Sequence, residues 1–189
     1  MYHISNDKRS KESSTWIYEA LEHLLDSRSF DDITVTDVCN QAKIGRVTFY
    51  RHYDCLEDVL RKKCDERFEG FIPYFKEYHI HKRNYPGFLR PFLRYWYVNA
   101  TILELIIKAN KAYIINEGMD RLIELSKLLP LKENNIHLNY DNYYATIRTS
   151  VTLAILVEWI KNGLNLAPDD LSDLLLKQMK HALELNMLF

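Results

Sequence analysis

The chain has 189 residues, of which 47% are hydrophobic and 27% charged, as in an ordinary soluble protein of one or two domains. Its net charge of −1 excludes a protein that is basic overall, so any binding to nucleic acid must depend on a local basic surface. Three cysteines without close spacing argue against a disulfide framework, and no apolar run is long enough to cross a membrane. Because residues 1–12 have no hydrophobic leader, we expect a cytoplasmic protein with no membrane partner.

Apolar residues recur at helical spacing along most of the chain, and no segment has the alternation typical of a strand. Five Gly and five Pro are few, which favours long helices with short connections. The predicted fold class is therefore all-α. In chain order, the spacing predicts helices over about 10–27, 34–42, 46–53, from 55 onward, 92–129, 141–164 and 168–187.

Two of these predicted helices are short and separated by a three-residue turn at 43–45. Thr34 followed by Asp37 is a variant of the capping box that starts a helix. Residues 43–53 contain three Lys or Arg and no acidic residue, so this part of the surface is basic. A short helix presented in this way fits the major groove of DNA. The side chains expected to point outward from it are Arg46, Val47, Thr48, Tyr50 and Arg51.

The run ITVTDVCNQAKIGRVTFYRHY, residues 33–53, resembles the DNA-binding domain of the TetR family, and the resemblance extends over residues 11–60. It implies that Thr34 and Thr36 contact phosphate, that residues 46–48 face base edges, and that Tyr50 and His52 bind phosphate. Arg46 is the expected reader of guanine. The predicted DNA-binding residues are Thr34, Thr36, Gly45, Arg46, Val47, Thr48, Tyr50, Arg51 and His52.

The chain departs from the family pattern at two places near this motif. Lys43 stands in the turn where the family usually has glycine, so the turn is open to a different backbone geometry. Cys55 and Leu56 stand where the helix after the motif often starts with serine followed by a phosphate-binding lysine, so one backbone contact is expected to be missing. Lys8, Arg9 and Lys11 are candidates to compensate as a flexible arm near DNA.

Residues 1–60 are therefore predicted to form a helix-turn-helix DNA-binding domain, and residues 61–189 a helical dimerisation and effector domain. The helix over 141–164 is apolar on two faces, and such a helix must be covered on both sides. The stretches AILVEWIKNGLNLAPDDLSDLL and LELIIKANKAYIINEG resemble the C-terminal domain of TetR-type regulators from low-GC Gram-positive bacteria. This implies a four-helix bundle between two subunits, with the monomer core as the alternative. The predicted interface residues are Ile155, Trp159, Leu171, Leu175, Met179 and Ala182.

Eleven of the 24 aromatic residues lie within residues 68–97. Such a cluster is typical either of a pocket for an apolar or aromatic effector or of a packed core. The candidate pocket residues are Phe71, Phe75, Phe92, Tyr95, Trp96 and Tyr113.

No Ser/His/Asp set or carboxylate pair has catalytic spacing, so the sequence predicts no enzyme, no cofactor and no metal site. The favoured hypothesis is a transcriptional repressor that binds double-stranded DNA at a palindromic operator as a homodimer and is released by a small apolar effector. The alternative is a TetR-fold interaction module or coregulator that acts through a protein partner.

Overall fold

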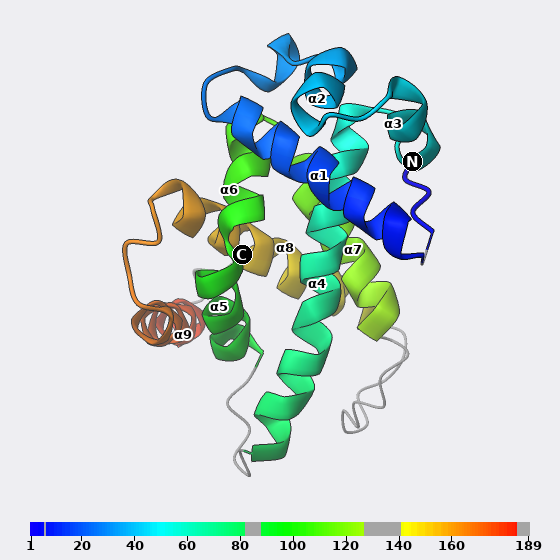
Figure 1. Ribbon diagram of the computed structural model, residues 1–189. Helices are drawn as coiled ribbons and strands as arrows, with labels where there is room; N and C mark the ends of the chain where they lie inside the picture. The colour runs from blue at the N-terminus through cyan, green and yellow to red at the C-terminus, as the bar shows by residue number, and fades with distance from the viewer. Residues whose placement is uncertain (6, 82–87, 127–140, 185–189) are drawn as a thin grey trace. The chain divides into compact units, whose positions relative to one another are not determined.

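The computed structural model of the chain describes residues 1–5, 7–81, 88–126 and 141–184 (Figure 1). Within these ranges the backbone is helical apart from short connections, and the one pairing of extended backbone joins Tyr2 to Tyr53. The all-α prediction is confirmed. In the described part of the chain, no helix combines the length and apolar character needed to cross a membrane.

The chain folds into two compact units. Unit 1 comprises Met1–Phe68 with Thr101–Leu128, and unit 2 comprises Glu69–Ala100 with Leu129–Phe189. The segment 1–60 lies wholly within unit 1. Unit 1 also contains Thr101–Leu128, a segment that the sequence analysis assigned to the second domain.

Unit 1 is built around its first helix, which packs against the two short helices that follow (Figure 1). The buried face of this helix includes Ile17, Leu21 and Leu25 at helical spacing, which is why the periodicity predicted it. The elements of unit 1 are α1 (Lys8–Leu25), the 3-10 turn η1 (Phe30–Asp32), α2 (Val35–Ala42), α3 (Arg46–His52), the first part of α4 (Leu56–His81), α6 (Thr101–Lys108) and α7 (Tyr113–Ser126).

The start of α1 is fixed by Asp7, whose carboxylate accepts a hydrogen bond of 2.8 Å from the backbone N–H of Ser10. Lys8, Arg9 and Lys11 therefore belong to a capped helix. The expectation that these three residues form a flexible arm is wrong, because the Asp7 cap lies on their N-terminal side.

The turn between α2 and α3 has left-handed backbone at Lys43, with φ 55° and ψ 42°. This conformation brings the Cβ of an L-residue close to the following carbonyl, and glycine avoids that contact. We expect Lys43→Gly to raise the free energy of unfolding by about 1 kcal/mol in urea titrations. Gln41→Gly, in right-handed α2, is the matched control and is expected to lower it by up to about 1 kcal/mol. A Lys43→Gly protein less stable than wild type would contradict this account.

Unit 2 contains the second part of α4 together with α5 (Leu89–Asn99), α8 (Asp141–Lys161) and α9 (Pro168–Glu184). Helix α5 packs against α9, and Arg94 Nε donates to Asp169 Oδ1 at 2.7 Å across that contact. Arg90 forms a second ion pair between these helices with Asp173. The two ion pairs link successive turns of the two helices.

Candidate nucleic-acid interface

Helix α2 begins with a reciprocal capping box, as the sequence predicted. The Asp37 backbone N–H donates to Thr34 Oγ1 at 3.2 Å, and Asp37 Oδ2 accepts from the Thr34 N–H at 2.8 Å. The Thr34 hydroxyl also donates to Asp37 at 2.7 Å, and Arg28 Nη1 lies 3.3 Å from the same carboxylate. Thr34 is exposed, but its hydroxyl already serves the start of the helix.

These contacts lower the pKa of Asp37 from its ordinary value of 3.8 to about 2, with the Thr34 hydrogen bonds as the main cause and Arg28 next. A depressed pKa stabilises the fold above pH 3.8, and this contribution is lost as the pH falls toward 2. We expect Asp37→Asn to lower the unfolding midpoint near neutral pH and to approach wild type near pH 2. The control is Asp120→Asn, an exposed carboxylate on α7. A difference between Asp37→Asn and wild type that stays constant from pH 6 to pH 2 would argue against the capping role.

The inner side of α3 is anchored in the core of unit 1. The rings of Phe49 and Tyr53 are both buried, with centroids 5.7 Å apart. The Tyr53 hydroxyl lies 2.5 Å from Ser14 Oγ on α1. A seven-residue helix is not stable alone, so this anchoring determines which side of α3 faces outward.

The opposite side of α3 is open to solvent, as expected from the sequence. Val47 is 82% exposed, and Arg46, Tyr50 and Arg51 are exposed beside it, while Thr48 is half-buried. Because this apolar side chain is not buried in the single chain, it does not contribute to the stability of the fold through the hydrophobic effect. It is therefore a candidate contact for a partner surface.

The surface around α3 has a local charge opposite to that of the whole chain. No Asp or Glu occurs between Asp37 and Asp54, whereas Lys43, Arg46 and Arg51 are all exposed. Thr36 and Gly45, also predicted DNA-binding residues, lie on open surface as well. The arrangement suits an anionic ligand because the charges stand on a fixed helix.

His52 disagrees with its predicted role as a phosphate contact. Its side chain is only 2% exposed, with Nδ1 3.4 Å from Ser10 Oγ and no hydrogen-bond partner for Nε2 among the described residues. Burial lowers the pKa of His52, which favours the neutral ring. Helix α1 covers this last residue of α3, so the ring packs inward.

Sequence reasoning missed the extended segment that runs along the end of α3. The His3 N–H donates to the His52 carbonyl at 2.8 Å, and the Tyr2 hydroxyl donates to Asp65 Oδ2 at 2.8 Å. A pairing of two or three residues has no detectable periodicity, so no pattern predicted it. Leu56, the position that lacks the family's lysine, is buried and contributes to the core.

The predicted interface residues of α8 and α9 fall into different environments. Trp159 and Leu171 are buried within unit 2, where the Trp159 indole N–H donates to the Leu166 carbonyl at 3.2 Å. Their prediction as interface residues is corrected here, because the single chain already covers them. Ile155 and Leu175 are half-buried, Met179 is exposed, and the side chain of Ala182 lies outside what the structure describes.

The exposed apolar surface of α8 and α9 lies at other positions as well. Ile147 and Val151 are about half exposed and lie four residues apart on α8, in line with Ile155. Leu174 and Leu176 on α9 are also exposed. Ile147, Val151, Leu174 and Leu176 were not among the predicted interface residues.

Most of the predicted effector-pocket residues form one packed cluster in unit 2. The Phe71 ring centroid lies 5.4–5.5 Å from those of Phe75, Phe92 and Tyr95. Phe92 also contacts Trp96, at 6.3 Å. Rings that interdigitate in this way are typical of a filled core, the alternative that the sequence left open.

Tyr113 lies apart in sequence from the other predicted pocket residues, which belong to unit 2. It belongs to unit 1, where its hydroxyl donates to Glu57 at 2.5 Å and the Arg61 guanidinium lies 5.7 Å from its ring centroid. The expectation that Tyr113 lines a pocket with the aromatic residues of unit 2 stays a prediction.

Comparison with known proteins supports the architecture. No protein-family model matches the chain, and no curated protein matches it. The structure is similar to the crystal structure of Lin0861 from Listeria innocua, with a TM-score of 0.71 and 20% sequence identity over 95% of each chain. At this identity, the likeness establishes the fold alone.

Proposed function

We propose that the chain is a DNA-binding transcriptional regulator of the TetR type, which reads DNA with α3 and acts as a homodimeric repressor. The observation that carries the proposal is the exposed face of α3, where Val47 is 82% exposed between Arg46 and Tyr50. These side chains offer complementary contacts to a base pair step and its backbone. Arginine binds guanine O6 and N7, an apolar side chain contacts the thymine methyl, and a tyrosine hydroxyl bonds phosphate.

The way α3 is held supports this role. Phe49 and Tyr53 anchor its inner side, so that its outer face is presented without first having to be ordered. In a major groove, the N-terminal residues of such a helix lie nearest the base edges. Arg46 and Val47 are the first two residues of α3.

The second part of the proposal is a homodimer that uses α8 and α9. Ile147, Val151 and Ile155 form one stripe along α8, and Met179 is exposed on α9. Covering apolar surface with the same surface of a second copy gives a two-fold interface. Two such subunits would read half-sites about 34–36 Å apart, so the proposal includes a palindromic operator.

The direct test is fluorescence anisotropy with a labelled duplex taken from upstream of the protein's own gene, compared with a shuffled duplex. We expect a dissociation constant of about 10⁻⁸ M or below for the specific duplex and roughly 10⁻⁶ M or weaker for the shuffled one. The logarithm of the association constant should fall linearly with the logarithm of salt concentration. Equal micromolar affinity for both duplexes would refute sequence-specific regulation.

The packed aromatic cluster favours a protein partner over a small apolar effector as the signal. Phe92 and Trp96 are fully buried among neighbouring rings, so a ligand placed there would have to displace them. Saturable quenching of tryptophan fluorescence by an apolar dye would instead support the small effector.

A further inference from the structure

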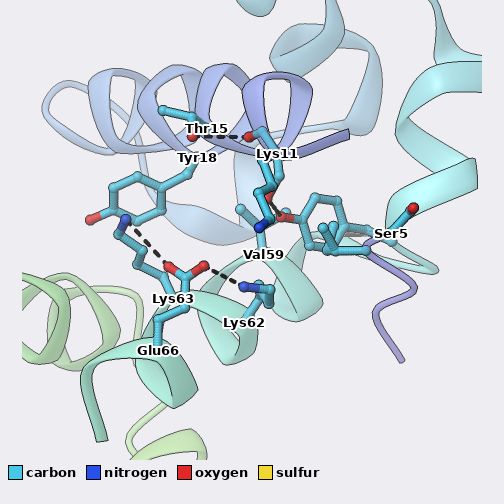
Figure 2. Close-up of a pocket in the computed structure, with 11 residues that line it drawn as sticks. Ser5, Lys11, Thr15, Tyr18, Val59, Lys62, Lys63 and Glu66 are labelled. Carbon is cyan, nitrogen blue, oxygen red and sulfur yellow. Dashed lines mark hydrogen bonds and ion pairs between the residues drawn. The ribbon is translucent and has the colours of Figure 1, made fainter. Parts of the chain in front are cut away.

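Unit 1 contains a pocket of about 230 Å³, and none of its lining residues is among the DNA contacts proposed above. Its walls come from the extended N-terminal segment, α1, the residue that follows α3, and α4 (Figure 2). Its lining residues include Ser5, Lys11, Thr15, Tyr18, Lys62 and Lys63. Glu66 is the acidic residue among the described lining residues.

Two lysines of α4 compete for one carboxylate in this pocket. Lys62 Nζ pairs with Glu66 Oε1, and Lys63 Nζ lies 3.5 Å from Glu66 Oε2. Each ammonium group also lies over an aromatic ring, Lys62 5.9 Å from the Tyr2 centroid and Lys63 4.9 Å from that of Tyr18. The two side chains are only 20% and 28% exposed, so water solvates these charges incompletely.

A third ammonium group, that of Lys11, comes from a different helix. Lys11 lies on α1 and has no ion-pair partner among the described residues. Figure 2 shows Lys11 above the hollow and Lys62 and Lys63 below it, with Glu66 between the two lower lysines. The lining therefore holds three ammonium groups and one carboxylate, and one negative charge leaves it two positive charges in excess.

We infer that this pocket binds a compact multivalent phosphate anion through the ammonium groups of Lys11, Lys62 and Lys63. Lysine binds phosphate as a point charge with three donors. The pocket volume is below the roughly 300–1,000 Å³ typical of ligand sites, so it suits a phosphate or pyrophosphate group and is too small for a whole nucleotide. Ser5 and Thr15 also line the pocket, and the Thr15 hydroxyl is already used, since it donates to the Lys11 carbonyl at 3.0 Å.

Binding there would join segments that lie far apart in the sequence. Lys11 stands on α1 and Lys62 on α4, and the lining residue Tyr53 directly follows α3. Any ligand that binds the folded state alone stabilises it in proportion to the logarithm of its concentration over its dissociation constant. The anion is therefore expected to raise the unfolding temperature, whether or not DNA is present.

The test is calorimetric titration of the full chain with sodium pyrophosphate at constant ionic strength, together with thermal unfolding in the same buffers. We expect saturable binding of one anion and a rise in the unfolding midpoint. Lys62→Gln and Lys63→Gln should each weaken binding about tenfold or more, the size of one charge-assisted hydrogen bond. Lys108→Gln, at an exposed lysine on α6, is the control and should bind as wild type does.

Glu66→Gln gives the opposite sign and does not depend on a lysine variant folding well. Removing the carboxylate frees both ammonium groups, so we expect the affinity for pyrophosphate to rise. Absence of saturable binding by wild type would overturn the inference, as would weaker binding by Glu66→Gln. An equal loss in Lys108→Gln would show general surface attraction and would also overturn it. The inference would also be overturned if Lys62→Gln lost affinity for DNA while its affinity for pyrophosphate stayed unchanged, since the lysine would then belong to the DNA surface.

Discussion

Arg46→Ala is expected to lower operator affinity by about 1–3 kcal/mol, or roughly 5- to 150-fold, and to relax the preference for one base pair. Arg46 is exposed at the first position of α3, so its removal leaves the core of unit 1 intact. The loss arises because a guanidinium that bonds guanine O6 and N7 together cannot be replaced by water with the same geometry. Anisotropy titrations with operators changed at single base pairs measure both effects.

Two companion variants separate base reading from general attraction. Tyr50→Phe keeps the edge-on ring contact with Phe49, at 5.5 Å, and removes only the hydroxyl, so it should weaken binding to all duplexes about equally. Lys108→Ala removes one positive charge elsewhere in unit 1 and should leave the base preference unchanged. If Arg46→Ala and Tyr50→Phe both retain wild-type affinity and selectivity, α3 is not the reading helix.

Val151→Asp is expected to convert the homodimer into a folded monomer and to abolish high-affinity operator binding. Val151 is about half exposed in the single chain, so the aspartate is solvated in the monomer and is buried only when a second copy covers α8. Burying an unpaired carboxylate costs about 3 kcal/mol or more, which raises the dimer dissociation constant roughly 100-fold. Sedimentation velocity at micromolar concentration measures the shift. DNA binding falls because one subunit reads only one half-site.

Asn165→Asp is the matched control for this prediction. It adds the same charge at an exposed position between α8 and α9 and should leave the dimer unchanged. Leu171→Asp differs from both, because Leu171 is buried within unit 2 and its replacement should unfold the chain. A wild-type protein that sediments as a monomer at micromolar concentration, or a Val151→Asp protein that remains a dimer, would contradict the proposed interface.

Local sequence patterns determined much of unit 1. The Thr34–Asp37 spacing predicted the capping box, because both partners lie within one turn and need nothing else to meet. Helical spacing also predicted the buried face of α1 and the outward direction of Arg46, Val47 and Tyr50. These features depend on residues three or four positions apart, for which the geometry of a helix is already fixed.

The tertiary structure decided which helix faces are covered and which distant side chains meet. Spacing placed Trp159 with Ile155 on the expected interface, but Trp159 is buried because the Leu166 carbonyl and the Tyr97 ring, 5.9 Å away, lie against it. The sequence does not distinguish His52 from the exposed polar residues of α3, and His52 is buried only because α1 lies against it. Lys11 and Lys62 share a pocket although 50 residues separate them. Periodicity predicts which side chains share one face of a helix. Whether that face is buried depends on segments that are distant in the sequence and are positioned by the whole fold.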